Sequence, residues 1–369
     1  MASVVDLFAD VAAIPSPSRH EAAVVAWTRA ELAALGLDVA AEPVGDGDGS
    51  NLLSRLDPTG AGTPLVFCAH LDTAAPDGRI EPVVEDGCVR NAAGTILGAD
   101  DKAAVAVLLE AVRTIITEHR EHAGIELLFT CQEEIGLQGV KAFGVDRLRA
   151  RAGFVMDHEG PVGSAVVAAP FQENVLVSFH GRAAHAGTAP EDGRSAVVAA
   201  ARAVAAMPNG RVDPETTANV GVVHGGTARN IVPETCTLEA DVRSFTRTRA
   251  EAVVADMLAA CRRAADELEC TVSSDVFEGY PGYTLDVGDV PVRLATRALA
   301  ACGQSADPVR SCGGTDANVL NARGIPTLNL GNGMRRIHTS DEHIAVADLH
   351  AMVEVTLAIV DAANSKGAT

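Results

Sequence analysis

Three apolar segments of this chain each run into residues that can bind a metal ion or move a proton, and this pattern constrains the fold more than any other feature. Residues 65–69 precede His70 and Asp72, residues 125–130 precede Glu133 and Glu134, and residues 153–156 precede Asp157. Short, apolar, β-branched runs are typical of buried strands. Open α/β sheets place their ligand crevice at the carboxyl ends of such strands. The pattern therefore predicts an α/β fold with a functional site where these strands end.

The rest of the chain alternates helices and strands in two different ways. Residues 3–35 are expected to form helix, interrupted by a turn at Pro15 to Pro17, and a second, buried helix is expected to start after Asp101. From residue 173 to 283 the order strand, helix, strand, strand, helix, strand is typical of a ferredoxin-like unit. We therefore expect a discontinuous first domain, with a mixed sheet flanked by helices, and an inserted α+β domain; the expected bounds are 1–168 and 284–369 for the first domain and 169–283 for the insert.

Composition excludes several classes of partner. The chain has 49 Asp and Glu against 29 Lys and Arg, a net charge of -20, and no basic cluster that could follow a phosphate backbone, so nucleic acid is not expected as a partner. No run approaches the roughly 20 apolar residues that span a bilayer, and the N-terminal segment lacks the features of a signal peptide. We expect a cytoplasmic protein without a membrane partner, whose eight cysteines remain reduced.

Two pairs of polar residues indicate a metal site. Asp72 stands two residues after His70 at a strand end, so both side chains could point to one side, and the Asp72 carboxylate could hold the second nitrogen of a metal-bound imidazole. Asp100 and Asp101 precede a buried helix. One Asp there could be a helix cap, but two adjacent carboxylates repel each other unless a cation neutralises them. A metal-bridging carboxylate is therefore expected at this position.

The adjacent Glu133 and Glu134 indicate two different roles at the end of an apolar strand. Like charges there would destabilise a site without a ligand. One carboxylate can bind a metal while its neighbour accepts the proton of an attacking water, as hydrolysis at a zinc site requires. Asp157 and His338 complete a set of oxygen and imidazole ligands suited to Zn, Co or Mn. The residues thus predict a metal-dependent hydrolase.

Nine short motifs occur in the order seen in a known family. They are CAHLDT, LGADDKA, CQEEIGLQG, VMDHEG, HGRAAHAGTAPEDGRSA, GGTARNIVPE, DVRSF, CGGTDAN and IHTSDEHI. In these motifs the chain resembles the aminoacylase and carboxypeptidase G group of co-catalytic zinc metallopeptidases, and it looks most like the peptidase T branch. The resemblance spans most of the chain. It implies a zinc-exopeptidase-like catalytic domain with a ferredoxin-like lid domain, and an aminopeptidase that hydrolyses short peptides.

The resemblance also implies a role for each residue of the metal site. It implies two divalent metal ions, Zn in the first place and Co or Mn as alternatives. The implied ligands are His70 and Asp157 for one metal, Glu134 and His338 for the other, and Asp100 as the bridge between them. Asp72 would orient His70, and Glu133 would be the general base that activates water and passes the proton to the leaving amine. The peptide bond between Asp100 and Asp101 would be cis.

Further residues are assigned through the same resemblance. His185 would stabilise the oxyanion, and Asn230 and Arg243 would contact the carboxylate or backbone of the substrate, a role that suits the planar fork of Arg. The residues implied to line the pocket are Gly313, Gly314 and Thr315. A homodimer through the lid domain is expected. His185 could act within its own chain or across the dimer, and we expect it to act within its own chain.

Departures from the family pattern keep other functions open. Ala103 and Ala104 stand where a Gly is expected, and Asp157 is followed by His158 and Glu159 where peptidase T has two Gly residues, so strict tripeptide specificity is not implied. A second hypothesis is an amidohydrolase that deacylates N-acyl amino acids, and a third is a catalytically silent binding protein. The complete ligand set and Glu133 argue against the third, because a binding protein needs no general base.

Overall fold

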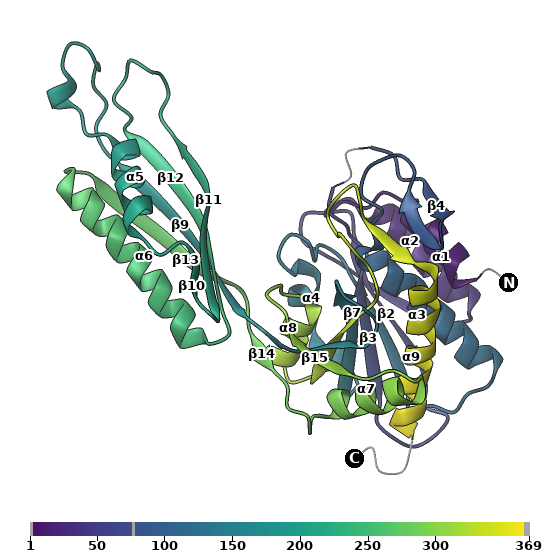
Figure 1. The fold of residues 1–369 in the computed structure, drawn as a ribbon. Helices are drawn as coiled ribbons and strands as arrows, with labels where there is room; N and C mark the ends of the chain where they lie inside the picture. The colour runs from purple at the N-terminus through teal and green to yellow at the C-terminus, as the bar shows by residue number, and fades with distance from the viewer. Residues whose placement is uncertain (1–2, 76–77, 365–369) are drawn as a thin grey trace. The chain divides into compact units, whose positions relative to one another are not determined.

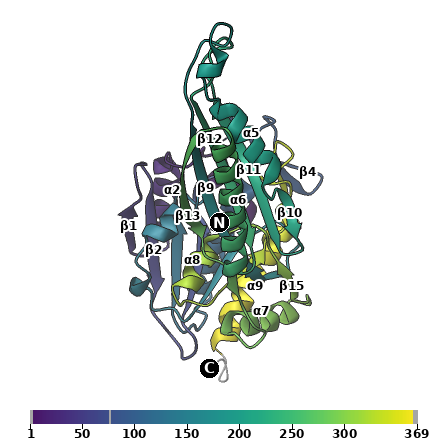
Figure 2. The same ribbon diagram turned by 90° about the vertical axis from the view of Figure 1, so that its left-hand side faces the viewer.

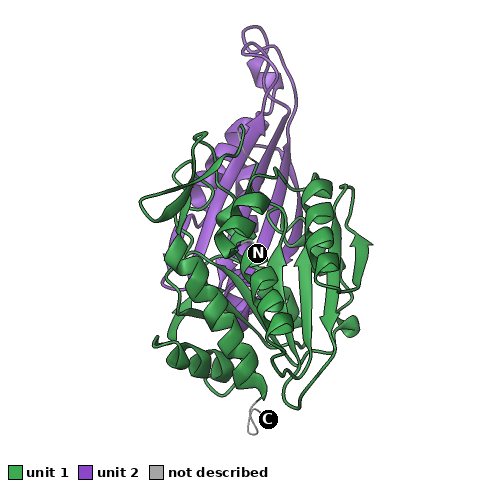
Figure 3. Cartoon of the chain, turned by 90° about the vertical axis from the view of Figure 1, so that its right-hand side faces the viewer, with its two compact units in different colours: residues 1–168, 284–369 green, residues 169–283 purple. Residues whose placement is uncertain are grey.

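The structure is a computed structural model that describes residues 3–75 and 78–364, and the chain separates into two compact units. The first unit combines Met1–Ala168 with Thr284–Thr369, and the second unit is Ala169–Tyr283 (Figure 3). The first unit is called the main unit below and the second the insert. Each has its own sheet, so each is described by itself.

A nine-stranded mixed sheet forms the centre of the main unit. Its strand order is β1-β2-β6-β3-β7-β16-β8-β14, with β15 paired to β8. The three central strands β3 (Leu65–His70), β6 (Ile125–Thr130) and β7 (Ala152–His158) are parallel, and β3 and β6 are buried along their whole length. The other strands are β1 (Val39–Pro43), β2 (Ser50–Leu56), β8 (Ser164–Ala169), β14 (Tyr283–Thr284), β15 (Asp307–Arg310) and β16 (Thr327–Gly331). The apolar segments seen in the sequence are therefore neighbours whose carboxyl ends share one edge of the sheet.

Helices pack around this sheet (Figure 1). The long α3 (Ala99–Thr117) contacts α1 (Val4–Ala12) and α9 (Val346–Asn364), and α7 (Val290–Ala301) packs on α9. Most of α3 is buried, as its apolar sequence predicts, and Ala103 and Ala104 within it have no exposed surface. The remaining helices are α2 (Ala22–Ala34), which lies against β1 and β2, α4 (Gln138–Ala142) and α8 (Asp316–Ala322).

A small three-stranded sheet was not anticipated from the sequence. It contains β4 (Pro82–Glu85), β5 (Cys88–Asn91) and β17 (His343–Ala345), in the order β17-β5-β4. Each strand has only three or four residues, and β4 is mostly exposed, so no periodic apolar pattern marks them. This sheet holds the segment that follows His338.

The insert is a five-stranded antiparallel sheet with the order β10-β11-β12-β9-β13. Its strands are β9 (Phe171–His180), β10 (Gly210–Asp213), β11 (Thr216–Gly225), β12 (Thr235–Ser244) and β13 (Thr271–Tyr280). The helices α5 (Ala196–Ala206) and α6 (Arg247–Glu267) share an apolar core with the sheet, and Figure 2 shows α6 lying along it. Apart from the short β10, this is the expected ferredoxin-like order, so the α/β fold with a ferredoxin-like insert is confirmed.

The described residues also bear on two expectations drawn from composition. Within residues 3–75 and 78–364, no helix is long and apolar enough to cross a membrane. All eight cysteines are present as thiols, and Cys68 and Cys131 are buried near the polar ends of β3 and β6.

Candidate active site

The five expected metal ligands come from five different segments of the main unit. His70 is the last residue of β3, Asp157 lies near the end of β7, and Glu134 follows β6. Asp100 lies in the first turn of α3, and His338 lies in the loop before β17. Because β3, β6 and β7 are parallel neighbours, their carboxyl ends bring three of these residues to one edge of the sheet.

Asp100 lies between the two imidazoles. Its Oδ1 is 3.1 Å from Nε2 of His70, and its Oδ2 is 3.1 Å from Nε2 of His338. Glu134 Oε1 is 3.0 Å from the same His338 nitrogen, and Asp157 Oδ1 is 4.0 Å from His70 Nε2. The structure thus brings all five residues together as two donor sets that share Asp100. A carboxylate in this position could bridge two cations.

The donor chemistry fits divalent metal ions. His70, Asp100 and Glu134 each offer one ligand atom, and these three atoms lie within 4.8 Å of one another. Hydrogen bonds from His338 to Asp100 and Glu134 raise the pKa of His338 to about 10. Burial raises the pKa of Asp157 well above its usual range, and the charge of Asp100 adds to this effect. A cation that binds here would displace the protons that His338 and Asp157 retain. Mixed imidazole and carboxylate ligands are typical of Zn, Co and Mn.

Asp101 differs sharply from its neighbour. The peptide bond between Asp100 and Asp101 is cis, as the resemblance implies. Asp101 is fully buried, and neither of its carboxylate oxygens has a hydrogen-bond partner among the described residues. Burial raises the pKa of this carboxyl well above its usual range. Asp101 is therefore neither a helix cap nor a member of the two donor sets.

The Asp72 side chain holds the loop that carries Glu133 and Glu134. Its carboxylate accepts the backbone N–H of Glu133 at 2.9 Å and of Glu134 at 3.1 Å, and the Ser18 hydroxyl at 2.6 Å. The Nδ1 atom of His70 is instead 2.8 Å from the backbone oxygen of Asp72 and 3.6 Å from its Oδ1. The backbone oxygen of Asp72 is thus the nearer partner of His70 Nδ1, and the Asp72 carboxylate, which was expected to orient His70, lies farther away.

Glu133 lies beside this cluster without joining the ion pairs of its neighbour. Burial raises the pKa of the Glu133 carboxyl well above its usual range, while the charge of His70 opposes this shift and that of Asp316 adds to it. A carboxylate with a raised pKa is a stronger base toward water. Glu133 therefore has the properties of a proton acceptor, and Glu134 those of a ligand.

The residues that depart from the family pattern after Asp157 have a definite contact. Glu159 Oε1 accepts the backbone N–H of Arg336 at 2.6 Å, two residues before His338. Burial lowers the pKa of His158. Glu159 therefore ties the end of β7 to the loop that carries His338.

The expected pocket-lining loop has a structural role at its last position. Thr315 is the N-cap of α8, and its hydroxyl accepts the N–H of Ala317 at 3.3 Å in a capping box with Asn318. Gly313, which precedes Gly314, donates its N–H to the Ser311 hydroxyl at 3.1 Å. The Thr315 N–H also donates to Asn318 Oδ1 at 3.0 Å, and its backbone oxygen accepts the N–H of Asn318 at 2.9 Å, so the polar groups of Thr315 hold the start of α8.

His185 of the insert presents one nitrogen as a donor. Its Nδ1 atom accepts the backbone N–H of Gly187 at 3.1 Å and of Thr188 at 3.2 Å. A neutral imidazole that accepts at Nδ1 carries its proton on Nε2. The side chain is exposed, so this N–H could be donated to a developing oxyanion.

Asn230 and Arg243 lie at opposite ends of the insert sheet. The backbone oxygen of Asn230 accepts the N–H of Ala186, next to His185, whereas Arg243 on β12 pairs with Gln172 at the start of β9. Between Gln172 and His180, the last residue of β9, the strand extends roughly 26 Å at about 3.3 Å per residue. An extended tripeptide spans only about 10 Å. Within one insert, Asn230 and Arg243 therefore lie too far apart to contact the same end of a short peptide.

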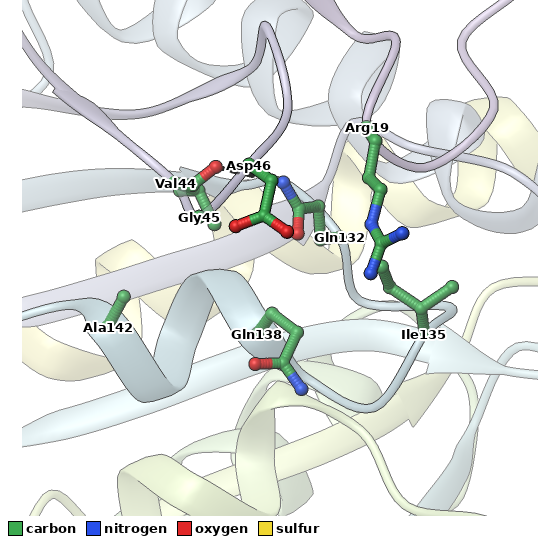
Figure 4. Close-up of a pocket in the computed structure, with 8 residues that line it drawn as sticks. All are labelled: Arg19, Val44, Gly45, Asp46, Gln132, Ile135, Gln138 and Ala142. Atoms are coloured by element: carbon green, nitrogen blue, oxygen red, sulfur yellow. Dashed lines mark hydrogen bonds between the residues drawn. The ribbon is translucent and has the colours of Figure 1, made fainter.

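A polar pocket beside the Glu133 loop was not foreseen from the sequence (Figure 4). The pocket has a volume of about 350 Å³, and it is lined by Arg19, Val44, Gly45, Asp46, Gln132, Ile135, Gln138 and Ala142. The Gln132 amide donates to the backbone oxygen of Val44 at 2.9 Å, which fixes one wall. Arg19 and Asp46 offer opposite charges, so a charged group of either sign could be accepted. The pocket joins residues of the Glu133 motif to loops that carry no motif, so no sequence pattern marks it.

Comparison with known proteins identifies the family. Residues 174–269 match the M20 "Peptidase dimerisation domain", and residues 51–212 match the description "Peptidase family M28". The chain is 38% identical over 359 residues to the Bacillus subtilis protein YqjE, covering 96% of this chain and 97% of that one.

Two solved structures extend this similarity to nearly the whole chain. The aminopeptidase PepT from Bacillus cereus is 38% identical with a TM-score of 0.90, and the alignment covers 98% of both chains. A tripeptidase from Staphylococcus aureus is 33% identical with a TM-score of 0.93, again over 98% of both chains. The chain therefore belongs to the aminoacylase and carboxypeptidase G group of metallopeptidases, the M20 family, as a peptidase T-like member, and it is a metal-dependent exopeptidase.

Proposed function

We propose that this enzyme removes the N-terminal residue of short peptides at a site that holds two divalent metal ions. The observation that carries the proposal is the position of Asp100, whose two oxygens each face one imidazole at 3.1 Å. In this proposal His70 and Asp157 would hold one ion, Glu134 and His338 would hold the other, and Asp100 would contribute to both. The similarity to an aminopeptidase and a tripeptidase supports a peptide with a free amino terminus as the substrate.

Zinc is the proposed metal, with cobalt or manganese as working substitutes. When bound, such ions lower the pKa of water and polarise the scissile carbonyl group. Two imidazoles with three carboxylates form a ligand set that all three metals accept. The donor set therefore supports the metal class, and the choice among the three depends on measurement.

Glu133 is the proposed general base. Its carboxylate takes a proton from the attacking water as the new C–O bond forms, and it gives that proton to the amine nitrogen as the C–N bond breaks. The hydrogen bond from its backbone N–H to Asp72 at 2.9 Å keeps this residue in place. The Nε2–H of His185 donates to the oxyanion, a type of interaction that contributes most when it is preorganised.

A homodimer formed through the insert is also proposed. The match to the "Peptidase dimerisation domain" over residues 174–269 supports it. The edge strand β13 is ten residues long and exposes Val276 and Phe277, so it could pair with a second copy. The separation of Arg243 from His185 within one insert favours a site that takes Arg243 from one copy and His185 with Asn230 from the other. This differs from the sequence-based expectation that His185 acts within its own chain. A cytoplasmic location remains a prediction.

One set of assays tests the proposed function. The protein is stripped of metal with a chelator, reloaded with Zn²⁺, Co²⁺ or Mn²⁺, and assayed on free dipeptides, free tripeptides and N-acetyl amino acids. We expect chelation to abolish hydrolysis, at least one of the metals to restore it, and free tripeptides to be cleaved faster than N-acetyl amino acids. Faster cleavage of N-acetyl amino acids would identify an amidohydrolase instead, and no hydrolysis of any substrate by the metal-loaded protein would support a binding protein.

A further inference from the structure

The buried side chain of Glu342 holds the turn that precedes Asp100. Its Oε2 accepts the backbone N–H groups of Leu97 and Gly98, both at 2.8 Å, and its Oε1 accepts the N–H of Asp100 at 3.1 Å. Glu342 is only 2% exposed. Gly98 has a φ of 75°, a left-handed conformation that helps successive N–H groups to converge on one anion. These three hydrogen bonds fix the position from which Asp100 extends its carboxylate.

Glu342 also belongs to the loop that carries His338. Arg335 and His343 close this loop with two backbone hydrogen bonds of 3.0 and 3.1 Å, and His338 and Glu342 lie between them. The N–H of Glu342 donates to the backbone oxygen of Thr339 at 3.1 Å, which makes the loop compact. One carboxylate therefore connects the segment of one candidate ligand to the segment of another.

His338 needs such support more than the other candidate ligands do. Its side chain is 48% exposed, whereas that of His70 is 2% exposed. Its φ of 61° lies in the left-handed region, which residues other than Gly adopt only when the surrounding structure holds them. Without an anchor, the His338 ring could leave its position 3.1 Å from Asp100 Oδ2.

We propose that Glu342 is a positioning residue that sets the spacing between Asp100 and His338 and thereby raises the affinity of the site for its metal ions. The inference rests on the ligand roles given under the proposed function. Its physical basis is preorganisation, because ligands that are already held at the correct spacing lose less freedom when a metal binds. A purely structural role for Glu342 would instead affect the stability of the fold and leave metal affinity unchanged.

Glu126 offers a matched control within the same unit. It is 4% exposed, and its Oε2 accepts the backbone N–H groups of Arg149 at 2.7 Å and Ala150 at 2.8 Å. It is the second residue of strand β6, at the end opposite to Glu133. Replacing Glu126 with Gln thus disturbs the same kind of contact, a buried carboxylate that binds backbone amides, at a place remote from the candidate ligands, and it also removes the ion pair of Glu126 Oε1 with Arg55 Nε at 2.7 Å.

The test compares Glu342→Gln, Glu342→Asp and Glu126→Gln in the full-length protein. The Zn²⁺ affinity is measured by competition with a chromophoric chelator, and circular dichroism and thermal unfolding report the fold. We expect Glu342→Gln to weaken Zn²⁺ binding roughly 10- to 100-fold relative to wild type, the range for residues that orient metal ligands, and Glu126→Gln to leave it unchanged. Glu342→Asp keeps the charge but is one methylene shorter, so it should also bind Zn²⁺ more weakly than wild type.

Wild-type Zn²⁺ affinity in Glu342→Gln, or an equal loss in Glu126→Gln, overturns the proposal. Should Glu342→Gln fail to fold, Glu342→Asp decides in the same way: weaker Zn²⁺ binding supports a positioning role, and wild-type affinity overturns it. Because Zn²⁺ binding is measured without substrate, a wild-type protein that binds Zn²⁺ but cleaves no peptide contradicts the proposed function and leaves this test intact.

Discussion

Glu133 and Glu134 are neighbours in the chain, yet their surroundings differ. Glu134 accepts the backbone N–H of Ala74 at 3.1 Å and pairs with His338 at 3.0 Å. Glu133 takes part in no ion pair of this kind among the described residues. Two adjacent carboxylates at a strand end thus have different surroundings, because the turn after β6 directs their side chains differently.

The first prediction concerns Glu133→Gln. The amide cannot accept a proton from water, so we expect kcat to fall by roughly 10²- to 10⁴-fold, the usual contribution of a general base. Metal content, measured by mass spectrometry, should stay at the wild-type level because Glu133 is not proposed as a ligand. A variant that loses its metal but keeps its turnover per bound metal would show that Glu133 is a ligand.

The second prediction separates the two functions of Asp72. In Asp72→Asn the backbone oxygen that holds His70 remains, whereas one acceptor for the Glu133 and Glu134 amides is replaced by a donor. We expect kcat to decrease by about 10- to 100-fold while Zn²⁺ affinity stays close to wild type. If Zn²⁺ affinity falls as strongly as kcat, the Asp72 side chain acts on His70 after all.

Single residues mark the limit of what the sequence could predict. The residue types of the ligand cluster were readable, because carboxylates and imidazoles that gather at the ends of apolar strands are typical of a ligand site. The partner of His70 Nδ1 could not be predicted, since the spacing between His70 and Asp72 permits either the carboxylate or the backbone oxygen of Asp72. Glu342 was missed because it lies in a polar stretch, TSDEH, that is typical of an exposed loop.

At the scale of elements, the turn from β6 to α4 is packed tightly around Gly139. A methyl group on Gly139 would lie 2.2 Å from the backbone oxygen of Cys131 and 2.7 Å from Asn51 Oδ1. The Asn51 side chain also donates to the backbone oxygen of Gly139 at 2.8 Å and accepts the N–H of Cys131 at 3.1 Å. Hydrogen bonds and close packing at Cys131 and at Gly139 therefore fix both ends of the segment that carries Glu133 and Glu134.

The third prediction follows from this packing. Gly139→Ala should destabilise the fold by about 1–3 kcal/mol, the usual cost of an added methyl group in a filled space, and it should lower kcat because the loop must shift. Gly288→Ala is the control, since a methyl group there meets no atom within 4 Å. Thermal unfolding and peptidase assays of both variants provide the measurement, and equal stability of the two would contradict the packing argument.

Elements with strong periodicity were predicted well, and short ones were not. The strands expected at residues 65–69 and 125–130 and the buried helix after Asp101 lie where the apolar runs placed them. The strands β4, β5 and β17 have three or four residues and draw their stability from pairing with each other, which no local pattern records. The register of β9 with β12, which separates Arg243 from Asn230, is likewise a long-range property.

At the scale of the whole molecule, the proposed sharing of residues between two copies can be tested by mixing variants. The fourth prediction uses Glu133→Gln and His185→Ala, each nearly inactive alone. If His185 acts across a dimer, a mixed dimer contains one site with both wild-type residues. After subunit exchange of equal amounts, about a quarter of the wild-type activity should return, because half of the dimers are mixed and each has one intact site of two.

The same experiment has clear contrary outcomes. If His185 acts within its own chain, no site in the mixture contains both residues, and activity stays at the level of the parents. Sedimentation of the wild-type protein gives the control, and strictly monomeric behaviour would remove the basis for exchange.

The pairing of the first and last strands of the insert has a consequence for how such enzymes arise and can be rebuilt. Gln172 near the start of β9 lies beside Tyr280 near the end of β13, and Leu285 then donates its N–H to the backbone oxygen of Val167 at 2.7 Å. The two ends of the insert, where the chain leaves and rejoins the main unit, thus lie next to each other. A segment with adjacent ends can be gained, lost or exchanged in a single genetic event without reconnecting the strands around it. Other inserted domains, or a short linker in place of this insert, could therefore be grafted between Ala168 and Thr284.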